Sequence, residues 1–188
     1  YKWPYFPLIS GNENIISKNI DAISTNFVSS IDTLKNNIKK TILLSSSDKS
    51  RIIQTPTKIS LSILENPIPS VTFNKKNIPI AVLLSGSFTS VFKDRIAPKD
   101  KNINFKEFSD STEIIVISDA DIIRNDISNK GIPLPLGYDK YINYTYDGNK
   151  KFILNAIQYL SDNDGLINLR SKTLKIRLLN MDLINNYK

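Results

Sequence analysis

Two carboxylates, Asp119 and Asp121, follow an apolar run in this sequence, and Asp126 lies close behind them. Ligands of open α/β sheets bind at the carboxyl ends of the strands, and carboxylate oxygens are typical ligands of Mg²⁺ or Ca²⁺. The same residues are equally suited to cap a helix that begins near Ile122 and Ile123. Two carboxylates do not complete a metal site, so the pattern indicates a helix cap or a contact with a ligand or partner, and no bound metal.

A short polar turn, Ser85-Gly86-Ser87, follows the strongest strand signal, residues 78–84. Its backbone amides could meet an anion if a helix begins at Phe88. Ser87 would need a neighbouring base to act as a nucleophile, and a single glycine does not make a phosphate-binding loop. We therefore interpret this segment as a structural turn or a ligand contact.

Four tyrosines gather in a stretch rich in Asn and Asp: Tyr138, Tyr141, Tyr144 and Tyr146. Tyrosine is rigid and amphipathic, which suits protein interfaces. The same side chains could equally form a lid over the local core, and both interpretations stay open. Tyr138 and Tyr141 are the two that we select as candidate contact residues.

The sequence contains no cysteine and no histidine. This excludes disulfides, thiolate and Ser-His-Asp catalysis, and metal sites built from Cys or His. We predict a protein that is not an enzyme and has no cofactor. A metal-assisted hydrolase that uses Asp119 and Asp121 is the remaining enzymatic alternative.

The net charge is +7, from 25 basic and 18 acidic residues, and only five of the basic residues are arginine. Nucleic-acid sites favour arginine because its planar guanidinium forms paired hydrogen bonds, so we predict no nucleic-acid partner. One basic group near the end of the chain could bind an acidic partner but is more typical of a charged solvent face. It consists of Arg170, Lys172, Lys175 and Arg177.

Short apolar runs that end in small polar residues predict strands at 40–44, 78–84 and 113–117. At 59–63, isoleucine and leucine alternate with serine, which predicts a half-buried strand. The run 78–84 is apolar throughout, so we expect it to be covered on both faces, as in a parallel sheet. Residues 147–160 predict a helix, capped by Asp147, whose broad apolar face lies on the sheet. Strands that alternate with helical segments favour an α/β fold with a mostly parallel sheet.

The segments between these elements are expected to be extended or irregular. The prolines and aromatic residues of 3–7 predict an extended, docked segment, and the polar stretch 93–112 predicts a loop. The apolar loop 131–137 is expected to be packed down or used for contact. Residues 166–169 and 174–179 are expected to form terminal strands or docked segments.

The length of 188 residues predicts one domain. No apolar run approaches the ~18 residues that a membrane span needs. The start at Tyr1 indicates a fragment of a longer protein, whose targeting signals and anchors would lie outside it.

Three blocks of the sequence resemble a known family. They are Ile80–Phe92, Val116–Ile123, and Asn149–Leu160 continued by Leu166–Lys172. In this order and spacing they resemble the GldG family of gliding-motility-associated auxiliary components of ABC transporters, which belongs to the wider ABC-transporter auxiliary domain family.

The resemblance implies a Rossmann- or flavodoxin-like sheet with flanking helices, in a single extracytoplasmic domain over residues 1–188. The domain would belong to a membrane-anchored parent on the periplasmic side of the inner membrane. It would be non-catalytic, with a separate permease and ATPase as partners. The alternative from the residues is a module that binds a small molecule or glycan between the loops that follow positions 84 and 118.

Overall fold

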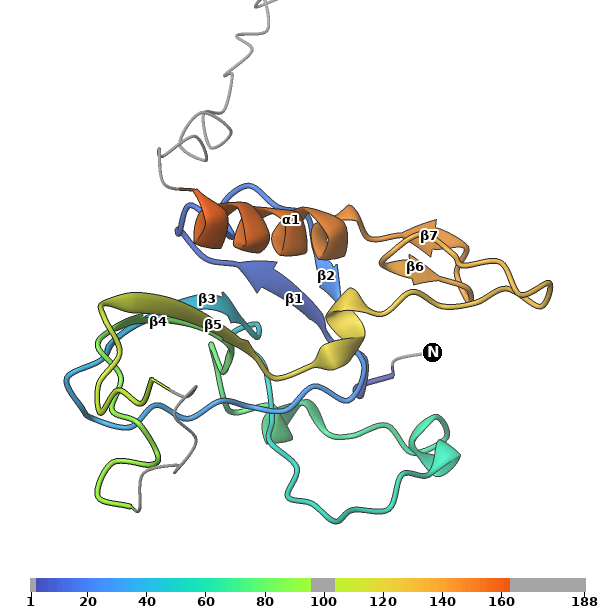
Figure 1. Cartoon of the computed structure of the whole chain (residues 1–188). Coiled ribbons are helices and arrows are strands. Elements are labelled where there is room, and N and C mark those ends of the chain that lie inside the picture. Colours follow the sequence, from blue (N-terminus) through green and yellow to red (C-terminus); the bar gives the residue numbers. More distant parts are fainter. Residues whose placement is uncertain (1–2, 96–103, 163–188) are drawn as a thin grey trace, which may run out of the picture.

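Five strands form one sheet in the order β2-β1-β3-β4-β5, in the computed structural model that describes residues 3–95 and 104–162 (Figure 1). The strands are β1 (Leu8–Gly11), β2 (Ile23–Ser24), β3 (Lys39–Ser45), β4 (Pro79–Gly86) and β5 (Thr112–Ile117). A separate hairpin consists of β6 (Tyr138–Asp139) and β7 (Tyr144–Thr145). The helices are α1 (Asp147–Ser161) and the 3₁₀ turns η1 (Leu61–Ile63), η2 (Ser70–Thr72) and η3 (Ala120–Ile123).

Every neighbouring pair of strands in this sheet is antiparallel. The prediction of a mostly parallel, Rossmann- or flavodoxin-like sheet is therefore wrong. A parallel pair needs a long crossover connection, usually a helix. The connection 46–78 between β3 and β4 contains only the short turns η1 and η2 among irregular residues, so nothing in it supplies such a helix.

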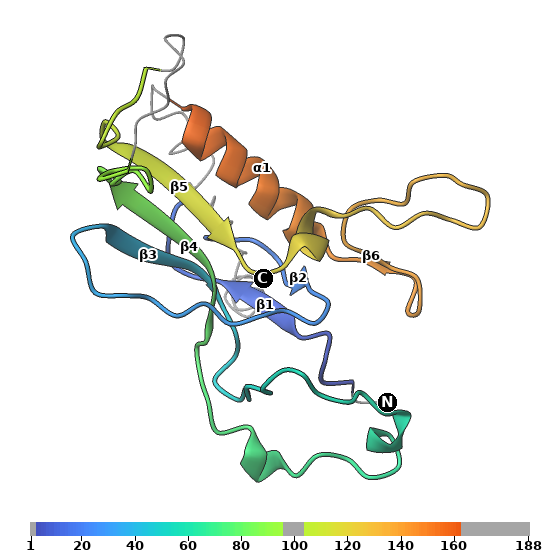
Figure 2. The same cartoon turned by 60° about the horizontal axis from the view of Figure 1, so that its bottom comes forward.

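Strand β4 lies between β3 and β5, as its continuous apolar character suggests. Four successive residues, 80–83, are buried, which confirms that both faces of this strand are covered. Its partner β3 has irregular register at Leu43 and Leu44, and both of these side chains are fully buried. Such a bulge bends a strand and increases its twist, which fits the strong curl of the sheet (Figure 2).

Helix α1 packs across the curled sheet and contacts both of its edge strands, β2 and β5. Phe152, Ile153 and Ala156 project from the helix into the core, where they meet apolar side chains from the strands and from η3. Ile9, Ile23, Leu44 and Ile122 are among the fully buried members of this core. The helix thus closes the open side of the sheet, as Figure 1 shows.

The other predicted elements are confirmed only in part. The strands at 40–44, 78–84 and 113–117 and the helix at 147–160 are confirmed within a few residues. The predicted strand 59–63 is wrong, because Ser60 caps the exposed turn η1 there. Asp147 is not the cap of α1, which starts after Tyr146 without a side-chain cap.

The helix face is also narrower than predicted, because Ile157 and Leu160 remain exposed. No helix within residues 3–95 and 104–162 combines the length and the apolar character that crossing a membrane requires. The four basic residues from Arg170 to Arg177 and the predicted strands at 166–169 and 174–179 lie outside the described residues.

Candidate functional site

Asp119 caps η3 and connects it to the segment that follows β2. Its Oδ1 accepts a hydrogen bond from the amide of Asp121 at 2.8 Å, and its Oδ2 accepts one from the amide of Asn26 at 2.9 Å. The residue is only 8% exposed. Both carboxylate oxygens therefore already have backbone donors. The prediction that Asp119 caps a helical segment is confirmed.

Burial raises the pKa of the Asp119 carboxyl above its ordinary value of 3.8, although the bonds from the amides of Asn26 and Asp121 act against this. The folded protein therefore holds this proton more tightly than the unfolded chain does. The protonated carboxyl stabilises the fold below pH 3.8, and this contribution is lost as the pH rises through the higher pKa of the folded state.

We expect this pH dependence to be visible against an Asp119→Asn variant, which lacks the titrating group. The free energy of unfolding of the wild type, relative to that of the variant, should fall as the pH rises from below 3.8. Urea denaturation of both proteins at a series of pH values measures the difference. A difference that is constant or grows with pH would contradict the expectation.

The turn Ser85-Gly86-Ser87 lies at the opposite end of β5 from Asp119. Because β4 and β5 are antiparallel, Ser85 faces Glu113 and Ala81 faces Ile117. Along the strands, the Ser85–Glu113 pair lies four residues, or about 14 Å, from the Ala81–Ile117 pair that is next to Asp119. The single ligand site expected between the loops after 84 and 118 is therefore not formed.

The two serines of this turn are occupied by neighbours. The Ser85 hydroxyl donates to Oε1 of Glu113 at 2.9 Å, and the Ser87 hydroxyl donates to the carbonyl of Ser109 at 2.7 Å. No helix begins at Phe88, whose amide donates to the Ser109 hydroxyl. The anion site that a helix start would provide is absent here.

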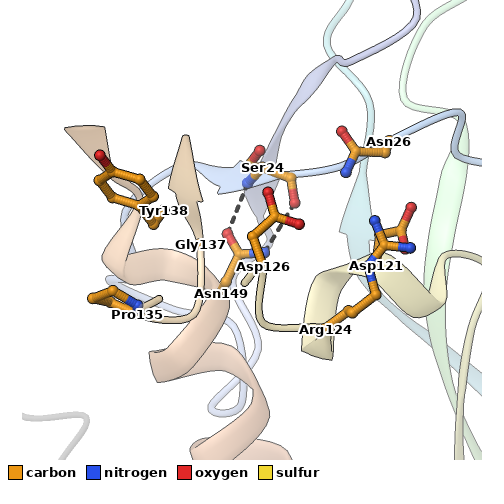
Figure 3. A pocket seen from close by; sticks show the side chains of 9 residues that line it. All are labelled: Ser24, Asn26, Asp121, Arg124, Asp126, Pro135, Gly137, Tyr138 and Asn149. Atoms are coloured by element: carbon orange, nitrogen blue, oxygen red, sulfur yellow. Dashed lines mark hydrogen bonds and ion pairs between the residues drawn. The ribbon is translucent and has the colours of Figure 1, made fainter. Parts of the chain in front are cut away.

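Two of the candidate residues, Asp121 and Tyr138, line the same small pocket (Figure 3). The lining comes from four separate segments of the chain: Ser24, Asn26, Asp121, Arg124, Asp126, Pro135, Gly137, Tyr138 and Asn149. The pocket volume is about 40 Å³, which is enough for a water-sized group. Pockets for metabolites are typically about ten times larger, so this one suits only a small polar group.

Asn149 is the most important lining residue that the sequence analysis did not single out. Its Oδ1 accepts from the amide of Ser24 at 2.8 Å, and its Nδ2 donates to the carbonyls of Ser24 at 2.9 Å and Ile122 at 3.2 Å. It lies three residues before Phe152 and four before Ile153, on the buried face of α1. That spacing is the sequence signal that could have marked it as buried.

Residues 125–145, which we call the arm, project from the body of the protein beyond the start of α1 (Figures 1 and 2). The arm contains the β6–β7 hairpin and an isolated bridge between Ile127 and Pro133, beside which the amide of Leu134 donates to the carbonyl of Asp126 at 2.7 Å. Five large apolar or aromatic side chains on it are exposed: Ile127, Ile132, Tyr141, Ile142 and Tyr144.

The four tyrosines differ in their exposure and in their contacts. Tyr141 is 80% exposed near the tip of the hairpin. Tyr138 is half-buried and its hydroxyl donates to Oδ1 of Asn143 at 2.8 Å. Tyr144 and Tyr146 pack edge to face, with ring centroids 4.9 Å apart. The cluster therefore combines internal packing with an exposed tip.

The comparison with known proteins decides the family. Residues 1–156 match the sequence model of the ABC-transporter auxiliary family, described as an ABC-type uncharacterized transport system. The chain belongs to this family. The auxiliary protein has no match among curated proteins and none among solved structures.

Family membership makes the protein an auxiliary component of an ABC-type transport system and implies association with that system. It confirms the resemblance at the level of the wider family. In the part of the auxiliary protein that the structure describes, no group of three or more Asp or Glu side chains is placed to hold a metal ion.

Proposed function

We propose that the auxiliary protein is a non-catalytic accessory domain that works by contact with the other subunits of its transporter. The observation that carries this proposal is the arm, which projects from the rest of the fold (Figure 2) and carries exposed isoleucines and tyrosines. Exposed apolar groups that gather in one place mark interaction sites. The short β6–β7 pairing and the isolated bridge between Ile127 and Pro133 connect the two sides of the arm.

The chemistry of the candidate residues supports a role in contact over one in catalysis. Cysteine and histidine are absent from the sequence, and both carboxylate oxygens of Asp119 accept hydrogen bonds from backbone amides. The pocket beside Asp121 is too small for a metabolite or a sugar ring. These observations favour protein contact over the glycan-binding and hydrolase alternatives.

The finer parts of the proposal follow from the sequence blocks. We place the domain on the periplasmic side of the inner membrane, in a parent anchored outside residues 1–188. The permease would be the direct partner, and the ATPase would be linked through it. A role in gliding motility is supported by the resemblance to the GldG family.

Photo-crosslinking from the arm tests this proposal. A benzoylphenylalanine in place of Tyr141, introduced into the parent protein in its native membranes, should give crosslinks to a transporter subunit. Val71 provides the matched control, since it is 82% exposed against 80% for Tyr141 and lies outside the arm. The proposal fails if position 141 gives no transporter subunit, or if both positions give the same products equally.

A further inference from the structure

The pocket at the base of the arm contains a carboxylate, Asp126, that forms no ion pair with any residue the structure describes. Oδ1 of Asp121 forms an ion pair of 2.8 Å with Nη1 of Arg124. The half-buried Asp126 carboxylate and the side-chain amide of Asn26 also line the pocket, and within residues 3–95 and 104–162 neither of these two groups has a hydrogen-bond partner. An ionised carboxylate only accepts hydrogen bonds, so Asp126 can accept from a donor group that enters the pocket.

The charged residues that line the pocket leave it with a net negative charge, which favours a positively charged occupant. Asp121 and Arg124 neutralise one another, which leaves the negative charge of Asp126 in a chain whose net charge is +7. Figure 3 shows Asp126 facing the Ser24 and Asn149 side of the pocket, away from the Asp121–Arg124 pair. A group that enters here is therefore expected to be a cation with several donors.

Size selects among cations. The volume of about 40 Å³ suits a compact ammonium group, which is a point charge with three donors. The described carboxylates do not provide the three ligands of a metal site. The adjoining arm carries exposed apolar side chains, which favour contact with a protein. The cation is therefore expected to be a side chain of a polypeptide that covers both the pocket and the arm.

We propose that this pocket receives the ammonium group of a lysine side chain from the transporter subunit that covers the arm. The inference rests on the proposed function, because it names the chemistry by which that same surface recognises its partner. Asp126 would accept the principal charge-assisted hydrogen bond, with Asn26 as a second acceptor.

Peptide titration of the full 188-residue chain tests this chemistry directly. The probe is acetyl-Leu-Lys-Leu-amide, and the control is the same peptide with an acetylated lysine side chain. In amide chemical-shift spectra, the first peptide should cause saturable shifts at Ser24, Asn26 and Tyr138. The acetylated peptide should not, because it lacks the charge.

A pair of isosteric variants isolates the carboxylate. Asp126→Asn should weaken binding of the lysine peptide about tenfold or more, the loss expected when one partner of a charge-assisted contact is removed. Asp48→Asn removes the same charge from the exposed loop after β3 and should leave binding unchanged. Equal shifts with both peptides, no saturable shift, or unchanged binding in Asp126→Asn would each overturn the inference.

The crosslinking experiment separates this inference from the function on which it rests. If Asp126→Asn reduces the crosslinks from position 141 and Asp48→Asn does not, both statements are supported. If the crosslinks to a transporter subunit persist in Asp126→Asn, the arm is the contact surface and the lysine pocket is wrong. If wild-type protein gives no such crosslinks, the proposed function itself fails.

Discussion

Replacing Asn149 by alanine should lower the free energy of unfolding by about 3–5 kcal/mol, since three hydrogen bonds disappear at once. The amide and carbonyl of Ser24 and the carbonyl of Ile122 would lose their partners. The side chain is only 1% exposed, so its three hydrogen bonds at the junction of α1, β2 and η3 are shielded from solvent in the folded protein. Urea denaturation followed by circular dichroism measures the loss.

Asn155 provides the matched control on the same helix. Its side chain makes a hydrogen bond of the same kind, in which Nδ2 donates to the carbonyl of Ile16 at 3.0 Å. Asn155→Ala should therefore cost about 1 kcal/mol. If the two alanine variants are equally stable, Asn149 does not have the role in fixing the start of the helix that its contacts describe.

The elements of this fold were predictable where their signal is local. The apolar run at 78–84 is buried on both faces, and the pattern at 147–160 forms α1. The direction of strand pairing is not a local property, because it depends on how the connections run. A parallel sheet would require crossover helices between the strands, and the long connection 46–78 has irregular structure in their place.

The error in direction also explains the error in the site. In a parallel sheet, the loops after 84 and 118 would meet at one edge, and Ser85 would lie near Asp119. The antiparallel register places Ser85 beside Glu113 instead. The observed pocket is lined by residues from β2, η3, the arm and the start of α1. These segments are far apart in the sequence, so the spacing of residues could not predict that they lie together.

Some features of the site were nevertheless visible in the sequence. Asp119 was recognised as a possible cap, and its side chain does accept a hydrogen bond from the amide of Asp121. Asp121 and Tyr138 were selected for different reasons and line one pocket. Residue chemistry therefore identified some of the residues at the site. Their grouping in one pocket depends on the tertiary fold and could not be predicted from the sequence.

Gly148→Ala is the second substitution with a large expected effect. We expect it to destabilise the protein, although helix propensity alone would predict stabilisation. Alanine is favoured over glycine inside a helix by about 1 kcal/mol. At this position, however, an added Cβ would lie 2.3 Å from the carbonyl oxygen of Asp21 and 2.4 Å from that of Ala22. Both are backbone atoms that cannot rotate away, so we expect a net loss of about 2–3 kcal/mol in unfolding free energy.

Lys150→Ala separates this clash from general effects at the start of α1. Lys150 is exposed two residues along the same helix, and its replacement should change stability by less than about 0.5 kcal/mol. Gly148 and Asn149 hold the same junction with β2, one by close approach and the other by hydrogen bonds. The double variant should therefore lose less than the sum of the single losses, because a helix start that the Gly148→Ala substitution has already displaced no longer reaches Ser24. A stabilised Gly148→Ala, or strictly additive losses, would mean that the helix start and β2 are not in the close contact described.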